Sequence, residues 1–257
     1  MGTSASEGKS GGALGRAPST DAARDAMGFR RRGDRTTRLE AFVDAAFAFA
    51  LTLVIVVVGS VPRTPDELME AAKSVPAFAA CFWLLATFWR GHVDWSERFG
   101  LDDPRSRNLS LLLILMVLLF VYPLRIVFAS FFNWISAGWL PIGFAFEGAA
   151  DVQRMFQMFA LAFGSMGAVM WALHRHAWQQ REAIGLDAVE EDALHTVTRI
   201  WVLVPAFAIA SLALSYWPAS YVVGAPGTVF FLMHAVMTGL RTRHRRRLAA
   251  ALSSSTA

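Results

Sequence analysis

The sequence RLEAFVDAAFAFALTLVIVVVGSV, residues 38–61, decides the fold of this chain. It is long and apolar enough to cross a lipid bilayer, which takes about 20 helical residues at a rise of about 1.5 Å each. It nevertheless carries a carboxylate, Asp44, in its N-terminal part. An ionisable group inside a spanning helix costs roughly 2.5–3.5 kcal/mol on insertion scales and usually faces protein or a water path. The stretch therefore predicts a membrane helix whose Asp44 has a polar partner elsewhere in the chain.

The composition places the whole chain in a membrane. Of its 257 residues, 55% are hydrophobic and only 17% are charged, against about 25% charged in soluble domains. Nine Trp and 20 Phe suit lipid-facing and interfacial surfaces. The net charge of +4 and the isoelectric point of about 9.8 could indicate nucleic-acid binding. The basic residues lie in short flanks beside apolar runs, however, so we predict a polytopic α-helical membrane protein with lipid contacts and no nucleic-acid partner.

The apolar runs and their breaks predict three regions. Residues 1–35, rich in Gly, Ser, Ala and Arg, are predicted to form a disordered basic tail, and residues 241–257 a second basic tail. Residues 36–240 are predicted to form a transmembrane domain of six helices, at about 39–61, 75–93, 108–130, 152–178, 198–216 and 219–240. Pro123 is expected to kink or end the third helix, residues 131–150 to form an interfacial loop, and residues 174–199 a charged connection.

The distribution of basic residues predicts the orientation. If the N-terminus is cytoplasmic, six spans place nearly all arginines next to the cytoplasmic ends of the helices. The basic residues left on the outer side are Arg63, Lys73, Arg125 and Arg154. This asymmetry follows the positive-inside rule, so both termini are predicted to be cytoplasmic.

Catalytic and metal-binding motifs are missing from the sequence. It has no Gly-rich phosphate loop, no His-Glu-x-x-His and no Gly-x-Ser-x-Gly elbow. Cys81 is the single cysteine, so no cysteine pair can hold a metal. The Thr-Val-Gly-Tyr-Gly filter of ordinary potassium channels is also missing. We therefore predict neither an enzyme nor a bound cofactor or metal.

Polar residues near the cytoplasmic side of the first three spans can form one cluster. They are Arg38, Asp44, Trp89, His92 and Asn108. Their similar depth allows Arg38 to offset the charge of Asp44 through charge-assisted hydrogen bonds. The simplest interpretation is a structural clamp that locks the three spans together. A proton-handling role for Asp44 and His92 is the alternative.

A second set of residues on the first span shares one helix face. Phe49, Thr52 and Val56 are spaced i, i+3 and i+7. In an oligomer this face could present an apolar ring, a ring of hydroxyls and a second apolar ring, and apolar constrictions can gate by dewetting. Ordinary helix packing would give the same spacing, so the pattern alone leaves both interpretations open.

At these residues the sequence resembles the lysosomal and prokaryotic potassium-channel family called transmembrane protein 175. The family has an Arg followed by Phe-Ser-Asp at the start of its first span and an apolar run containing Thr. The matching residues here are Arg38, Phe42, Asp44, Phe47, Ala48, Ala50, Thr52 and Leu53. The second span carries the aromatic-Trp-x-x-His pattern at residues 88–92, and Asn108 opens a Leu-rich run like that of the third span.

The resemblance implies a homotetramer whose first spans surround a pathway for potassium ions without a re-entrant filter loop. The pore-lining positions would be Phe49, Thr52 and Val56, and the conserved cytoplasmic network would be the five polar residues above. The chain departs from the family in having Val43 for Ser, Ala45 for Gly and a Phe at the constriction, where Ile or Leu is usual. The resulting hypothesis is a potassium-permeable channel.

Two other classes of protein remain as alternatives. A proton-coupled secondary transporter would use Asp44 and His92 as its relay. A membrane scaffold would have no permeation path at all.

Overall fold

The computed structural model describes residues 24–33, 36–56, 62–217 and 225–255. Most of the predicted N-terminal tail, the last residues of the first predicted span and the first residues of the sixth lie outside these ranges, as does the side chain of Val56. The described chain is helical, apart from an isolated bridge between Arg24 and Arg30.

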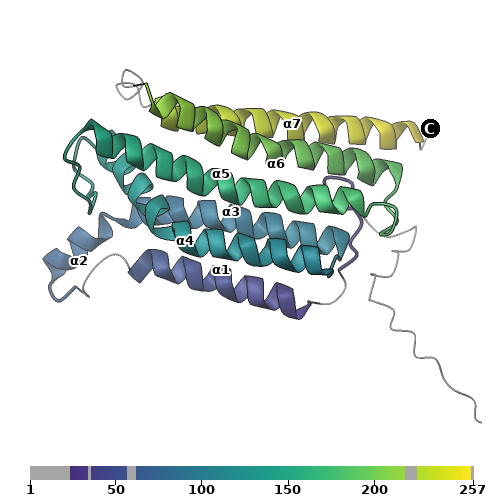
Figure 1. The fold of residues 1–257 in the computed structure, drawn as a ribbon, viewed down its shortest axis with the longest axis horizontal. Helices are drawn as coiled ribbons and strands as arrows, with labels where there is room; N and C mark the ends of the chain where they lie inside the picture. The colour runs from purple at the N-terminus through teal and green to yellow at the C-terminus, as the bar shows by residue number, and fades with distance from the viewer. Residues whose placement is uncertain (1–23, 34–35, 57–61, 218–224, 256–257) are drawn as a thin grey trace, which may run out of the picture.

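Seven helices run up and down along one long axis (Figure 1). Helix α2 is short and lies at one end of the assembly beside the end of α1. At the opposite end of the assembly, α1, α4 and α6 begin and α3, α5 and α7 finish. The helices are α1 (Arg38–Val56), α2 (Pro65–Ala72), α3 (Val75–Phe99), α4 (Pro104–Ile135), α5 (Ala149–Gln179), α6 (Ala188–Ser215) and α7 (Ala225–Ser255).

Among the described residues, three helices are long and apolar enough to cross a membrane, namely α4, α5 and α6. The pair α2 and α3, bent by 44° at their junction, would add a fourth if it is counted as one span. The prediction of an all-α membrane protein is therefore confirmed. Length and composition single out three to four spans in the described part of the chain, fewer than the six that the sequence predicts.

Capping residues fix where the helices begin and end. Asp103 accepts hydrogen bonds from the first backbone amides of α4, and Gly100, with φ of 57°, ends α3 in the left-handed conformation. Asp187 and Glu190 form a capping box at the start of α6. The expected charged connection over 174–199 is wrong, because α5 extends to Gln179 and α6 begins at Ala188.

Two further predicted boundaries are corrected in α4. Pro123 is expected from the sequence to kink or end the helix. It lies inside α4 and does not end it, since neighbouring helices can satisfy the backbone groups that a proline frees in a membrane helix, and the kink stays a prediction. The helix continues to Ile135, so the expected loop at 131–150 is shortened to residues 136–148.

The N-terminal prediction is wrong for residues 24–33, which pack against the helices. Phe29 is buried and meets the ring of Phe99 edge to face at 5.5 Å. The backbone amides of Arg32 and Gly33 donate to the carbonyl of Glu97 at 2.8 and 3.1 Å. We call residues 24–33 the N-terminal strap. Its residues contact α3 and α6 at one end of the bundle.

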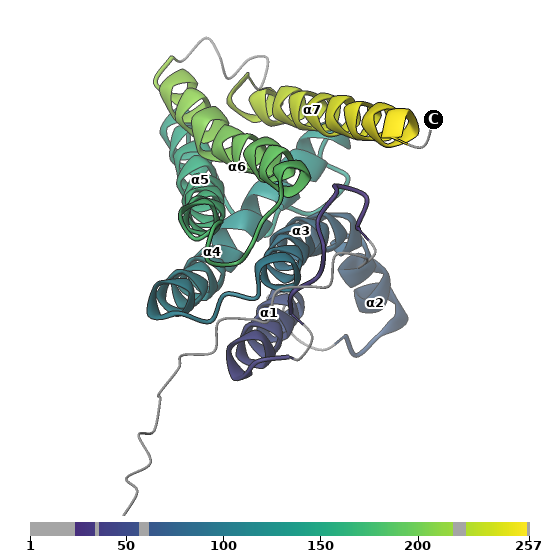
Figure 2. The same cartoon turned by 90° about the vertical axis from the view of Figure 1, so that its right-hand side faces the viewer.

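The second tail is also corrected, because residues 241–255 continue α7 as helix. His244 lies in this part and is buried, and its Nε2 donates to the carbonyl oxygen of Met27 in the strap at 2.9 Å. Figure 2 shows α7 lying on the α6 side of the bundle, away from α1.

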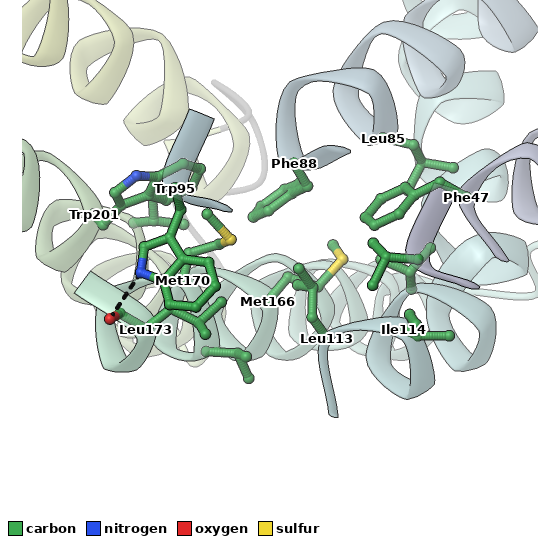
Figure 3. Packing of buried hydrophobic residues seen from close by; sticks show 14 of the residues in the cluster. Phe47, Leu85, Phe88, Trp95, Leu113, Ile114, Met166, Met170, Leu173 and Trp201 are labelled. Atoms are coloured by element: carbon green, nitrogen blue, oxygen red, sulfur yellow. Dashed lines mark hydrogen bonds between the residues drawn. The ribbon is translucent and has the colours of Figure 1, made fainter. Parts of the chain in front are cut away.

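The core runs between α1, α3, α4, α5 and α6 (Figure 3). Phe47 of α1 and Phe88 of α3 are buried here. Small residues let the helices approach closely, as membrane helices require. A Cβ atom at Gly167 would lie 2.5 Å from the Cβ of Val204, so α5 and α6 can pack at this distance only with glycine there.

Candidate functional site

Helix α1 has one buried face and one open face. Val43, Phe47, Ala50 and Val54 are buried against α3 and α4, at the i, i+4, i+7 and i+11 spacing of a single helix face. Thr37 begins the helix, because its hydroxyl accepts from the amide of Glu40. The buried face fixes the rotation of α1, so the opposite face points away from the rest of the described chain.

Two of the three residues proposed for the pore lie on this open face. Phe49 is 57% exposed, and Thr52 is exposed one turn further on. The Thr52 hydroxyl donates to the carbonyl of Phe49 at 2.7 Å. Its proton is thus directed to the backbone, and its oxygen lone pairs remain available to accept a bond or to approach a cation.

The polar residues predicted to lie near the cytoplasmic side form two separate hydrogen bonds. The indole Nε1 of Trp89 donates to Asp44 Oδ1 at 2.8 Å. His92 Nε2 is bonded to the hydroxyl of Ser110 at 2.9 Å. The first bond joins α1 to α3, and the second joins α3 to α4, so each holds a pair of the helices that surround the core.

A cavity of about 230 Å³ lies beside these bonds, between α1, α3 and the end of the strap. Asp44 and His92 both line it. Glu40 also lines the cavity, and its carboxylate accepts a hydrogen bond from the hydroxyl of Ser96 on α3. The cavity therefore collects carboxylates at the N-terminal end of α1, on the same side of the bundle as the strap.

Arg38 and Asn108 are not part of this arrangement. Both are exposed, and in the described ranges neither forms a hydrogen bond or ion pair with Asp44, Trp89 or His92. The structure supplies Ser110, Ser96 and Glu40 as partners in their place. No sequence pattern distinguishes these two serines from others, because serine also packs in membrane helices without any special role.

The strongest buried ion pair joins the strap to α6. Glu190 is fully buried, and Arg32 donates to both of its carboxylate oxygens at 2.8 Å. The amide of Arg30 adds a third bond to Glu190 at 2.9 Å. Arg24 and Arg30 also bind Asp187.

A second link closes the same end of the bundle between α4 and α5. His176 Nε2 is bonded to Asp103 Oδ2 at 2.8 Å. Burial by itself would raise the pKa of the Asp103 carboxyl, but hydrogen bonds from His176 and Ser106 outweigh it and lower the pKa to about 2. Asp103 is therefore ionised at neutral pH and holds the start of α4 against the end of α5.

Comparison with known proteins connects this arrangement to one family. Residues 38–123 match the family described as endosomal/lysosomal potassium channel TMEM175. A protein of Marivirga tractuosa named "Potassium channel" is 36% identical over 110 residues, which are 43% of this chain and 44% of that relative. The match thus spans less than half the length of this relative.

Two solved structures have similar folds. The crystal structure of a variant of the potassium channel MtTMEM175, in complex with a nanobody–MBP fusion protein, superposes with a TM-score of 0.72 at 21% identity. It covers 86% of this chain and 97% of its own. A TMEM175 homologue from Chamaesiphon minutus, described as a lysosomal potassium-selective channel homologue, gives 0.50 at 18% identity and covers 80% and 96%.

The fold and the open face of α1 define a multi-pass membrane protein of the TMEM175 type. Residues 38–123, which include α1 and both polar links, are similar to the TMEM175 potassium-channel family. The resemblance predicted from its sequence is confirmed.

Proposed function

We propose that the chain is a potassium-permeable cation channel and not an enzyme, with α1 of each of four subunits lining the ion path. The observation that carries the proposal is the open face of α1, where Phe49 and Thr52 are exposed while the opposite face is buried. The family match covers this helix, and the relative from Marivirga tractuosa is named as a potassium channel.

In this proposal each residue of the open face has a distinct role. Phe49 and Val56 form apolar rings that gate by dewetting. Thr52 lies between them and offers a hydroxyl oxygen to a partly dehydrated ion, because its proton is already donated to a backbone carbonyl. Asp44, Trp89 and His92 hold α1, α3 and α4 in register.

The proposed orientation has six spans and both termini in the cytoplasm of a bacterial-type cell, within its inner membrane. It is supported by the strap and by the ends of α5 and α7, which lie at the same end of the bundle (Figure 1). That end carries Arg30, Arg32 and Arg175, among others, as the positive-inside rule requires of a cytoplasmic side.

A potassium flux assay with purified protein in liposomes tests the channel. We expect flux without an added gradient of any co-substrate. Phe49→Ala should increase flux by removing the proposed constriction, and Phe231→Ala, an exposed Phe on α7, is the matched control that should leave it unchanged. Absence of flux in protein that is folded by its melting curve would refute the proposal.

The proposed role of the Thr52 hydroxyl is tested by a separate variant. Thr52→Val keeps the shape of the side chain and removes the oxygen, so we expect a lower ratio of potassium to sodium permeability with flux retained. An unchanged ratio would remove Thr52 from the ion path. The transporter alternative is disfavoured, because Asp44 is bonded to Trp89 and His92 to Ser110, which leaves no direct bond between the two relay groups in the described chain.

A further inference from the structure

A second cavity, of about 330 Å³, lies far from α1, between the end of α5 and the start of α6. Its volume is in the range of pockets that bind small ligands, roughly 300–1,000 Å³. It takes no part in the proposed ion path. Its walls are Trp171, Arg175, Trp178, Gln179, His195 and Thr198.

The lining contains hydrogen-bond donors and no carboxylate. The guanidinium of Arg175 lies 5.4 Å from the ring of Trp171 and forms no ion pair in the ranges the structure describes. The amide oxygen of Gln179 accepts from Arg105 at 2.9 Å, so its NH₂ group is the part that can donate into the cavity. A lining of this kind favours an anion.

Thr198 supplies an independent sign of a missing partner. Its hydroxyl oxygen is buried and has no hydrogen-bond partner among the described residues. Buried polar atoms in proteins nearly always have a partner. A ligand oxygen in the cavity would supply one.

The carboxylates near the cavity along the chain already have partners, and among them Asp192 Oδ2 lies 3.3 Å from His244 Nδ1. Glu191 pairs with Arg181 at 3.6 Å, and Glu182 pairs with the same guanidinium at 3.2 Å. Arg181 also lies over the ring of Trp178 at 4.7 Å. Arg175 therefore has no counter-charge among the described residues, and an anion from outside the chain can supply one.

The position of the cavity selects a lipid as the source of that anion. Helices α5 and α6 are both long and apolar enough to span a membrane, and the cavity lies where they approach the 180–187 connection. Tryptophan is enriched at the boundary between lipid and water, and two tryptophans form the walls here. Along α6 the face that bears Thr198 continues into the exposed side chains of Val202 and Ile209, which can lie against acyl chains.

We propose that this cavity binds the phosphate group of an anionic phospholipid of the cytoplasmic leaflet. Arg175 pairs with the phosphate, Thr198 and Gln179 donate hydrogen bonds to its oxygens, and the acyl chains follow the outer surface of α6. Surface potentials attract basic residues to anionic lipid in general, but this site adds a shaped cavity and a buried donor.

Native mass spectrometry of the full chain in detergent tests the site. The protein is titrated with dioctanoyl phosphatidylglycerol, with dioctanoyl phosphatidylcholine as the zwitterionic comparison and glycerol 3-phosphate as the soluble phosphate. We expect tighter binding of phosphatidylglycerol than of phosphatidylcholine and no competition by glycerol 3-phosphate at equal concentration. Arg175→Ala should weaken phosphatidylglycerol binding about tenfold, as expected for the loss of one charge-assisted hydrogen bond.

Two variants keep the test specific. Thr198→Val, which preserves volume, should weaken binding about threefold to tenfold. Arg107→Ala removes an exposed arginine at the same end of the bundle and should leave binding unchanged. Equal losses in Arg107→Ala and Arg175→Ala would indicate general surface attraction and overturn the site. Tight, Arg175-dependent binding of glycerol 3-phosphate alone would overturn the lipid as its ligand.

Discussion

The buried ion pair between the N-terminal strap and α6 gives the sharpest prediction for stability. Glu190→Gln keeps the size of the side chain and removes its charge. Arg32 would then be a buried cation without a counter-charge, since its side chain is only 2% exposed. Breaking a buried pair from one side costs about 3–5 kcal/mol.

For Glu190→Gln we expect the lower end of the range of about 3–5 kcal/mol. Arg32 keeps its hydrogen bonds to the carbonyls of Ile184 and Gly185, and the new amide oxygen can still accept one bond. We therefore expect the free energy of unfolding to fall by about 3 kcal/mol. At about 2–4 °C for each kcal/mol in a chain of this size, the melting temperature should fall by about 6–12 °C.

Thermal melting of the detergent-solubilised chain, followed by intrinsic fluorescence, measures this shift. Glu182→Gln is the matched control, because its carboxylate is 86% exposed and exposed pairs contribute about 0–1 kcal/mol. The double variant Arg32→Gln with Glu190→Gln should recover part of the loss, since no buried charge is then left unpaired. A melting temperature for Glu190→Gln equal to that of Glu182→Gln would refute the reasoning.

Two further predictions concern the packing of the bundle. Because the pKa of Asp103 is lowered to about 2 in the folded chain, its stabilising contribution is present above about pH 4, the ordinary range of an aspartate. The contribution is lost as the pH falls from 4 towards 2, so the melting temperature should fall across this window. In Asp103→Asn, the plot of melting temperature against pH should be flatter over the same window. Gly167→Ala should lower the melting temperature, because the added methyl would lie 2.5 Å from the Cβ of Val204, and overpacking costs typically 1–3 kcal/mol. Gly239→Ala, where no atom lies within 4 Å, should leave stability unchanged or slightly raised, and an equal loss in both would contradict the packing argument.

The sequence by itself determined the class of protein. Long apolar runs and sparse charge require a membrane, and the motif around Asp44 and His92 was sufficient to indicate the family. The face of α1 that carries Phe49 was also readable, because helical periodicity is a local property. These features depend on residues close together in the chain.

Only the tertiary structure decided which polar groups meet. Trp89 reaches Asp44 and Ser110 reaches His92 across helix boundaries, and local patterns do not encode such pairings. The strap is the clearest example. Its composition of Gly and Arg is typical of disorder, yet Arg32 is buried because it forms an ion pair with the buried carboxylate of Glu190, 158 residues away. A charged side chain in such a segment is held in place by a partner distant in the sequence and not by its chain neighbours. Only the folded structure can therefore show that the segment is ordered.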